Sequence, residues 1–319
     1  MGQALSMKLQ CEDRVKGIEM TSLNRDEIGR LVIQPPLFNE LMSKHTTFRV
    51  GGPAECLLSV VDERELCRVL EYAQDHSLPI FMLGRGSNLL VREQGIKGLV
   101  IKLDGDFKRW YFKNGFVTAG AGSYLPTLIE NCATFGLGGL EAGVGVPGTV
   151  GGALASNCGS ATAFIGAKVV ETRVVGVDGC IKVLSSDEMG FDYRSSRIPE
   201  IGWLLDVTFR LERQDPPSIK QCIREMLKSR NKAQPVNQPS AGCIFKNSSG
   251  DHASRLLDTA GVKGKRVGAA EFSMKHANFI VNLGGACASD VLDLASQARD
   301  LVYGRHGVSL DYEVRVVGE

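Results

Sequence analysis

Three short segments of the chain carry side chains that could do chemistry: PSAGCIFKN (239–247), FDYRSS (191–196) and YEVRVVGE (312–319). The first holds Cys243 after a glycine, and a thiol can serve as a nucleophile, a metal ligand or a proton donor. A small cysteine that packs as an apolar residue is the alternative. The others hold Arg194, which could clamp a carboxylate, and Glu313, which could donate a hydrogen bond when protonated. By spacing alone, Arg194 also fits a surface arginine and Glu313 a solvated strand edge.

The composition is that of an ordinary globular protein. The 319 residues are 43% apolar and 23% charged, which is enough for two or three domains. A net charge of +1 does not favour a nucleic-acid or membrane surface. No apolar run approaches the roughly 20 residues that a membrane span needs. We expect a monomer or a weak homo-oligomer with no nucleic-acid or membrane partner.

The cysteines and histidines indicate a reducing compartment. Nine scattered cysteines form no Cys-x-x-Cys pair, and five histidines show no ligand spacing, so we expect reduced thiols and no metal site. The N-terminus lacks the apolar core of a signal peptide, and its acidic residues argue against a transit peptide. We predict a cytoplasmic protein, or an organellar stromal one if a targeting segment was removed. Residues 1–37 are predicted to form an extension.

Helical and strand patterns interleave, which predicts an α+β or α/β class. Asp62 and Glu65 have capping-box spacing, Ser123 is a predicted N-cap, and an Asp-Gly pair at 178–179 predicts a hairpin. Helices are predicted over 60–77, 123–135, 219–232, 252–261 and 289–303. Strands are predicted over 79–84, 98–103, 115–122, 168–179, 180–185, 203–212, 279–284 and 310–318.

Two glycine-rich loops could hold a phosphate. LGRGSNLLV (83–91) offers backbone N–H groups with Ser and Asn donors, and a plain tight turn is the alternative. GVGVPGTVGGALASNCGS (143–160) contains G-x-G-x-x-G, yet it lacks a clear preceding strand, and its later glycines should weaken a helix. No Walker pattern occurs. Two such loops on one sheet favour a long dinucleotide such as FAD, with the Asn157 amide against a ring edge.

An ordered series of motifs carries a resemblance. From Phe38 to Glu319, the chain resembles the UDP-N-acetylenolpyruvoylglucosamine reductase (UDP-N-acetylmuramate dehydrogenase) family of flavoenzymes. The motifs are FNELMSKHTTFRVGGPAECL, LGRGSNLLV, GVPGTVGGALASN, DYRSS, PSAGCIFKN, GDHASRLLDTAGVKGKRVGAAEFSMKHANFIVN and YEVRVVGE.

The resemblance implies a two-lobed FAD-binding α+β fold, like that of vanillyl-alcohol oxidase, with a C-terminal α+β substrate domain. The implied parts are FAD subdomains at 38–110 and 111–213 and a substrate domain at 214–309, with strand 310–319 returning to the first subdomain. The implied FAD contacts are His45, Thr47, Gly51, Gly84, Arg85, Gly86, Ser87, Asn88, Leu89, Pro147, Gly148, Thr149, Gly151, Gly152, Ala153 and Asn157.

The family chemistry is a hydride relay from NADPH through FAD to UDP-N-acetylglucosamine enolpyruvate, which gives UDP-N-acetylmuramate for peptidoglycan. An enol ether accepts hydride only if charge can flow into its carboxylate, which needs preorganised stabilisation. The resemblance assigns that role to Arg194 and Glu313, with the pKa of Glu313 raised. Cys243 stands where the family commonly has a serine that donates a proton. A thiol pKa of about 8.5 predicts an alkaline limb in the activity.

Substrate-binding residues follow from the same resemblance: Arg230, Lys232, Lys246, Asn247, Lys275 and Arg315. NCGSATAF (157–164) departs from the common Asn-Ala-Gly-Ala pattern and has no tyrosine, which suggests the branch without a tyrosine-bearing loop over the substrate. Two alternatives stay open. One is another FAD-dependent oxidoreductase on the same scaffold, and the other is a nucleotide-binding homologue that has lost its chemistry.

Overall fold

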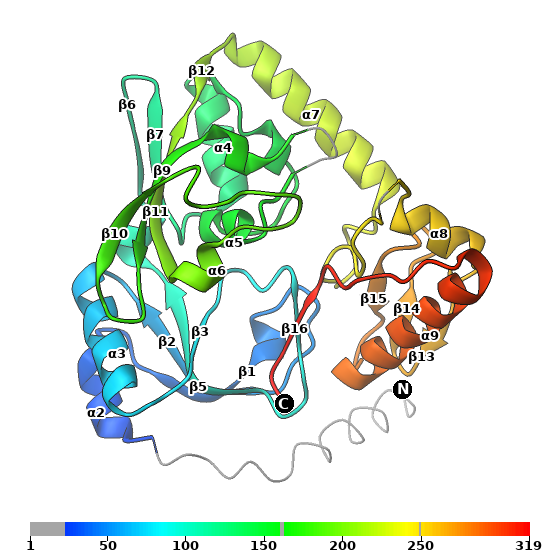
Figure 1. Cartoon of the computed structure of the whole chain (residues 1–319), viewed down its shortest axis with the longest axis horizontal. Helices are drawn as coiled ribbons and strands as arrows, with labels where there is room; N and C mark the ends of the chain where they lie inside the picture. The colour runs from blue at the N-terminus through cyan, green and yellow to red at the C-terminus, as the bar shows by residue number, and fades with distance from the viewer. Residues whose placement is uncertain (1–22, 160–162, 249) are drawn as a thin grey trace.

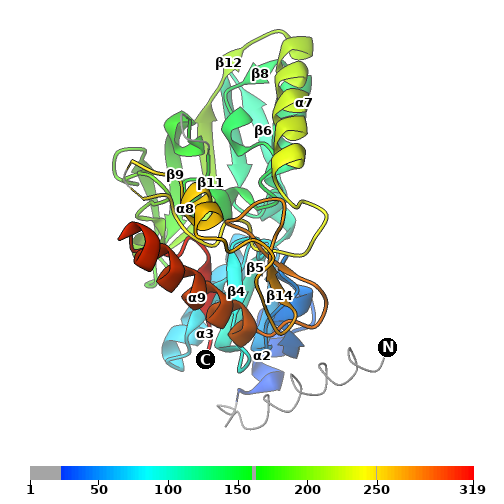
Figure 2. The same ribbon diagram turned by 90° about the vertical axis from the view of Figure 1, so that its right-hand side faces the viewer.

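The computed structural model describes residues 23–159, 163–248 and 250–319, and its elements gather around three larger sheets, accompanied by two two-stranded ones (Figure 1). Helices and strands are mixed along the whole described chain, which confirms the predicted α+β class. The large antiparallel sheet and its helices lie beside the N-terminal sheet, and the C-terminal elements form a third group (Figures 1 and 2).

The N-terminal sheet has four strands in the order β1-β2-β5-β3. They are β1 (Leu37–Leu41), β2 (Pro53–Val60), β3 (Ile80–Met82) and β5 (Ile96–Leu103). β1 is antiparallel to β2, whereas β2 and β3 run parallel to β5. The central β2 is buried on both faces, because Cys56 and Leu58 pack with helix α3 (Glu63–Asp75) and Leu57 packs on the opposite side.

Helix α3 begins at the predicted cap. Asp62 accepts a hydrogen bond from the Glu65 amide at 2.8 Å. The fully buried Glu65 carboxylate does not return to Asp62, since it accepts from the Val61 and Ile33 amides at 2.8 and 2.6 Å. This carboxylate therefore ties the segment before β1 to the helix.

Part of the predicted N-terminal extension is folded onto this group. Helix α2 (Arg25–Leu31) buries Ile28 completely in the cluster around α3. The Arg68 guanidinium of α3 also donates to the Leu31 carbonyl at 3.0 Å. Residues 23–37 thus pack against the N-terminal sheet group, whereas residues 1–22 lie outside the described part of the chain.

The second sheet has five strands, in the order β10-β9-β11-β7-β6, and every neighbouring pair is antiparallel. A Rossmann site needs a parallel sheet, so this arrangement excludes one here. The predicted hairpin at 176–180 joins β9 to β10 as expected. The strands are β6 (Trp110–Lys113), β7 (Phe116–Gly120), β9 (Val169–Val175), β10 (Ile181–Ser185) and β11 (Trp203–Arg210).

Helices cover one face of this sheet. They are α4 (Leu125–Thr134), α5 (Val150–Ala155) and the short α6 (Ile198–Ile201), accompanied by the pair β8 (Leu137–Gly138) and β12 (Glu212–Arg213). The cap of α4 is Tyr124 and not the predicted Ser123, whose hydroxyl donates to the Arg109 carbonyl instead. The glycines at 151–152 do not prevent α5, because the Thr149 hydroxyl caps it by accepting from the Gly152 amide at 3.2 Å.

The C-terminal group contains an antiparallel sheet of β13 (Arg266–Val267), β14 (Ala270–Phe272) and β15 (Ile280–Asn282). Helices α8 (Ala253–Thr259) and α9 (Ala288–His306) pack with it in one core. The long α7 (Pro216–Ala233) runs from the second sheet to this group (Figures 1 and 2). It begins before the predicted boundary, because Asp215 caps it and proline suits a first helical turn. Ile219 and Ile223 pack into the core of the second sheet group.

The end of the chain returns to the N-terminal group. Strand β16 (Arg315–Val317) pairs in parallel with β4 (Leu89–Val91), which follows the first glycine loop (Figure 1). The strand predicted over 310–318 is therefore only three residues long, and Glu313 lies just before it.

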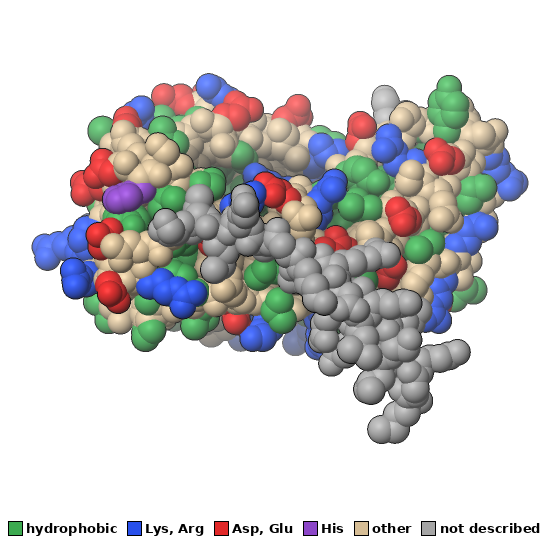
Figure 3. Space-filling view, turned by 90° about the horizontal axis from the view of Figure 1, so that it is seen from below, with side chains coloured by type: hydrophobic (Ala, Val, Ile, Leu, Met, Phe, Trp, Pro, Cys, Tyr) green, Lys and Arg blue, Asp and Glu red, His purple; other side chains and the backbone are tan. Residues whose placement is uncertain are grey.

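The surface shows no segregation of charge on the face in Figure 3, where acidic and basic side chains are interspersed. No helix among the described residues is long and apolar enough to cross a membrane. Nor does the described part of the chain gather three or more potential metal ligands. Among the described residues, free thiols are found at Cys56, Cys67, Cys132, Cys158, Cys180, Cys222 and Cys243.

Candidate active site

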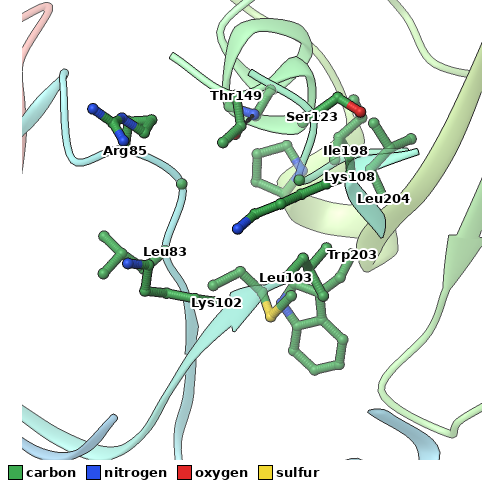
Figure 4. Close-up of a pocket in the computed structure, with 18 of the residues that line it drawn as sticks. Leu83, Arg85, Lys102, Leu103, Lys108, Ser123, Thr149, Ile198, Trp203 and Leu204 are labelled. Carbon is green, nitrogen blue, oxygen red and sulfur yellow. Dashed lines mark hydrogen bonds between the residues drawn. The ribbon is translucent and has the colours of Figure 1, made fainter. Parts of the chain in front are cut away.

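A cavity of about 720 Å³ lies between the N-terminal and second sheets (Figure 4). One wall comes from β3, the loop after it and the end of β5, and the other from the turn after β7, from α5 and from the start of β11. Its size suits a small-molecule or cofactor site. Five predicted cofactor residues line it: Gly84, Arg85, Thr149, Gly151 and Gly152.

The two glycine loops meet here, although they belong to different sheets and not to one sheet as predicted. A methyl group at Gly84 would lie 2.8 Å from the Thr149 hydroxyl oxygen, closer than a normal contact. A methyl at Gly148 would lie 3.6 Å from the Ser87 hydroxyl oxygen. The absence of a side chain at Gly84 therefore lets the loops approach each other and exposes backbone on the cavity wall, whereas the contact at Gly148 would be an ordinary one.

The other predicted cofactor residues do not line this cavity, and several instead shape its loops. A side chain at Gly86 (φ +63°) would collide with the His45 carbonyl, and the Thr47 amide donates to the Gly86 carbonyl at 3.2 Å. The residues outside the lining are His45, Thr47, Gly51, Gly86, Ser87, Asn88, Leu89, Pro147, Gly148, Ala153 and Asn157.

The Asn157 amide, predicted to bond a ring edge, is engaged inside the protein. It is 3% exposed, donates to the Asp192 carbonyl at 2.8 Å and accepts from the Gly166 amide at 3.0 Å. Asn157 therefore links the end of α5 to the turn that carries Arg194 through hydrogen bonds.

Three cations besides Arg315 line the cavity. Lys102 and Lys108 come from the end of β5 and the helical turn after it, and Arg85 comes from the first glycine loop (Figure 4). Burial first, and then the charges of Lys108 and Arg85, lower the pKa of Lys102. Asp104 offsets part of this charge, since its carboxylate lies 2.6 Å from the Lys108 ammonium. An anionic group such as a diphosphate would relieve the remaining repulsion.

Sequence reasoning missed Lys102 and Lys108, although a signal existed. Both lie within LVIKLDGDFK (99–108), where a buried strand ends beside the predicted phosphate loop. The apolar lining residues Ile198, Trp203 and Leu204 carry no comparable signal, because their types are equally typical of a core.

A second constellation brings together Arg194, Cys243 and Glu313, none of which lines the 720 Å³ cavity. The Arg194 Nε and Glu313 Oε1 atoms lie 2.8 Å apart, with side chains only 24% and 19% exposed. The charges of both groups act on the Cys243 thiol. Three segments distant in sequence therefore converge on one partly buried site.

Arg194 is held in an unusual conformation. It has a left-handed φ of +51° within the turn from Asp192 to Ser195, a conformation that costs free energy in a non-glycine residue. Its Nη1 donates to the Gly159 carbonyl at 3.2 Å. Its buried Nε–H has no well-aligned acceptor among the described residues, despite the nearby Glu313 carboxylate. A buried donor left in this way fits a ligand oxygen.

Cys243 and Glu313 are joined through the backbone. The Ile244 carbonyl accepts from the Glu313 amide at 2.8 Å, and the Asn88 side chain donates to the Glu313 carbonyl at 3.1 Å. Asn88 belongs to the first glycine loop, so a hydrogen bond joins this loop to the Arg194–Cys243–Glu313 cluster.

Burial sets the acidity of this cluster. It raises the pKa of the Cys243 thiol to about 12, with a further upward contribution from Glu313 that Arg194 and Arg230 oppose. Such a thiol stays protonated at ordinary pH, so this pKa does not support an alkaline limb that arises from Cys243. Burial also raises the pKa of Glu313, against the attraction of Arg194. That direction agrees with the sequence-based prediction, but its cause here is desolvation.

Two predicted substrate residues approach the cluster. Arg230 interacts electrostatically with Cys243 and Glu313, and its guanidinium donates to the Val144 carbonyl and the Gln234 side chain at 2.5 and 2.9 Å. Lys246 lies close enough to lower the pKa of Glu313.

The other four predicted substrate residues have different surroundings. Asn247 accepts from the Ala253 amide at 3.0 Å at the start of α8. Lys275 donates to a backbone carbonyl of α7, and Lys232 is exposed near the end of that helix. Arg315 lines the large cavity, with its guanidinium 5.5 Å from the centre of the Phe81 ring.

Known proteins match this chain over most of its length. A family model for the UDP-N-acetylenolpyruvoylglucosamine reductase C-terminal domain matches residues 234–317, and one for an FAD binding domain matches residues 54–185. UDP-N-acetylenolpyruvoylglucosamine reductase 2 of Symbiobacterium thermophilum is 42% identical over 280 residues, which are 88% of this chain and 91% of that protein. The chain belongs to the UDP-N-acetylenolpyruvoylglucosamine reductase family.

Other members of the family agree. The Moorella thermoacetica reductase is 40% identical over 89% of this chain and 93% of its own length. The crystal structure of the Thermus caldophilus reductase superposes with a TM-score of 0.79 at 37% identity, covering 89% of this chain and 98% of that one. The match over nearly the whole of that chain confirms the fold that the sequence motifs implied.

Proposed function

We propose that this chain is an FAD-dependent reductase that converts UDP-N-acetylglucosamine enolpyruvate to UDP-N-acetylmuramate for peptidoglycan synthesis, with NADPH as the reductant. The observation that carries the proposal is the Arg194–Glu313 ion pair beside Cys243, in a chain of this family. A neutral acid, a carboxyl and a guanidinium are the groups that reduction of an enolpyruvyl ether requires.

The residues of the large cavity fit FAD. Gly84, Gly151 and Gly152 leave backbone open to a flat ligand, and the Lys102, Lys108 and Arg85 charges suit a diphosphate. FAD, when bound, would carry two electrons from NADPH to the substrate carbon. The chain contributes the pocket, the cations and the exclusion of water.

On the substrate side, the Arg194 guanidinium, which lies beside Glu313, would also pair with the enolpyruvyl carboxylate. Glu313 would donate a hydrogen bond to the developing enolate when protonated, since its pKa is raised. Cys243 would donate its proton to the neighbouring carbon and regain one from solvent. Hydride and proton together complete a two-electron reduction of the double bond, while NADPH becomes NADP⁺.

Several finer statements belong to the same proposal. We propose the domain boundaries 38–110, 111–213 and 214–309, a cytoplasmic location and a monomer or weak homo-oligomer. Substrate contacts are proposed for Arg230, Lys232, Lys246, Asn247, Lys275 and Arg315.

An anaerobic titration tests the function. Purified protein should be yellow, NADPH should bleach the flavin, and the enolpyruvyl sugar nucleotide should restore the colour without oxygen. Colourless protein that binds no added FAD would favour the non-catalytic homologue. Bleaching without recovery would favour an FAD-dependent oxidoreductase with another substrate.

A further inference from the structure

One residue of the FSMKHANF motif takes no part in the mechanism above. Asn278 immediately precedes the segment that leads into β15, and it is 2% exposed. Burying an amide side chain is costly unless its hydrogen bonds are made inside the protein. Its partners therefore indicate what it is for.

Three of the four polar groups of Asn278 form hydrogen bonds with the backbone of the turn that carries Cys243. Its Oδ1 accepts from the Phe245 amide at 2.9 Å, and its Nδ2 donates to the Phe245 carbonyl at 2.8 Å. Its own carbonyl accepts from the Ile244 amide at 2.9 Å. The remaining group, the Asn278 amide, donates to the His276 Nδ1 at 3.3 Å. One residue thus pairs with three backbone groups of Ile244 and Phe245, in the turn that carries Cys243 (the donor turn).

The clamp also reaches Glu313. Asn278 bonds the Ile244 and Phe245 amides on one side of the turn. On the other side, the Ile244 carbonyl accepts from the Glu313 and Val314 amides at 2.8 and 3.4 Å. A shift of the turn would therefore move the thiol and the carboxyl together. Misplacement by about 1 Å can reduce a rate by about 10²-fold.

We propose that Asn278 is a positioning residue that fixes Cys243 and Glu313 for the proton-transfer step without touching substrate or cofactor. The inference rests on the proposed function. It assigns a role in the second half-reaction, the one that consumes the enolpyruvyl nucleotide, and none in the reduction of the flavin.

The test is Asn278→Asp. An ionised carboxylate can still accept from the Phe245 amide, but it presents a lone pair where the Phe245 carbonyl needs a donor. Protonation restores a donor, and burial should raise the pKa of the introduced carboxyl. Other titratable groups around the clamp are His276, Cys243 and Glu313, so the wild-type pH profile is the reference.

We expect Asn278→Asp to bleach with NADPH at about the wild-type rate. At about pH 8, we expect its reoxidation by the enolpyruvyl nucleotide to fall about 10²-fold with little change in KM. Reoxidation should recover relative to wild type as the pH is lowered toward about 5.5. Equal losses in both half-reactions, unchanged reoxidation, or a loss without acid recovery would each overturn the proposal.

Asn282→Asp is the matched control. Asn282 is also a buried amide, 6% exposed, but its side chain bonds the Phe48 carbonyl and the Gly284 and Ala286 amides and not the turn that carries Cys243. We expect any loss in this variant to affect both half-reactions alike and to show no acid recovery. The same selective, acid-reversible loss in Asn282→Asp would show that the effect is not specific to Asn278.

A second readout does not depend on the reaction. Iodoacetamide labelling of Cys243, followed by peptide mass spectrometry, should be several-fold faster in Asn278→Asp than in wild type, because the turn is looser. Equal labelling rates would count against the clamp. If wild type itself fails to reoxidise, the proposed function is wrong, while the labelling still decides whether Asn278 holds the turn. If Asn278→Asp does not fold, Asn278→Ser takes its place in the labelling and half-reaction assays.

Discussion

Replacement of Cys243 by alanine should separate the two half-reactions. Cys243 belongs to the cluster with Arg194 and Glu313 and not to the lining of the cavity proposed for FAD. We expect Cys243→Ala to remain yellow and to be bleached by NADPH at about the wild-type rate. Its reoxidation by the enolpyruvyl nucleotide should fall by about 10²–10⁴-fold, the usual contribution of a general acid.

The raised pKa of Cys243 also predicts the pH dependence of this step. A thiol pKa of about 12, compared with the ordinary 9.0, is a preference for the protonated form of about 4 kcal/mol. At pH 10, such a thiol is about 1% ionised, whereas an unperturbed thiol would be about 90% ionised. Reoxidation of the prereduced enzyme should therefore show no loss attributable to Cys243 up to about pH 10.

Stopped-flow flavin absorbance, from about pH 6 to 10, measures this under anaerobic conditions. Cys180→Ala is the control for loss of a thiol, because Cys180 is exposed in the β9–β10 turn and should leave both half-reactions intact. Undiminished turnover in Cys243→Ala would remove the thiol from the mechanism. A tenfold fall above pH 8 that disappears in Cys243→Ser would refute the raised pKa.

Three further changes follow from the same structure. Glu313→Ala should lower reoxidation about 10²-fold without slowing the bleaching by NADPH, because it removes a hydrogen-bond donor to the developing enolate, whereas Glu319→Ala at the exposed C-terminus should change neither half-reaction. Lys102→Met should weaken FAD binding to the apoprotein about tenfold in a fluorescence titration, and an unchanged Kd would argue against a diphosphate at this cation. Burial lowers the pKa of His276 in the folded protein. Just below pH 6.5, the imidazole therefore binds a proton in the unfolded chain but not in the folded one, so the stability of the fold decreases as the pH is lowered. His276→Asn keeps a hydrogen-bond acceptor near the position of Nδ1 but has no titratable group. Its Tm should therefore fall less than that of wild type between about pH 7 and 5, and an equal fall in Tm for both proteins would contradict this.

Local features of the fold were predictable because short-range chemistry decides them. Asp62 caps α3 through the amide three residues on, and the Asp-Gly pair at 178–179 turns the hairpin between β9 and β10. In both cases the partners are close in sequence, so residue type and spacing suffice. The glycine loops were located for the same reason, since residues such as Gly86 adopt conformations that favour glycine.

Features that depend on distant partners were not predictable. The two glycine loops lie on different sheets, and nothing in either loop encodes that assignment. The Glu65 carboxylate bonds Ile33, which is 32 residues away, in place of completing its own capping box. The Asn157 side chain follows a glycine-rich loop, which suggests a contact with a ligand. Its hydrogen-bond partners are instead the backbone groups of Asp192 and Gly166, which only the folded chain brings within reach.

The acidity of Cys243 is the clearest case in which folding changes the chemistry of a residue. Judged by residue type, a cysteine in place of the family's common serine should be a much stronger acid and should lose its proton in mild alkali. Burial and the Glu313 carboxyl move it the other way, to a pKa of about 12, and so toward the weak acidity of an alcohol. The turn that Asn278 clamps also keeps the thiol partly shielded, with the guanidinium of Arg194 close by. A serine hydroxyl is neutral in any protein surroundings, whereas this thiol is neutral because burial raises its pKa. In the proposed mechanism, the exchange of oxygen for sulfur therefore still leaves a protonated donor at neutral pH.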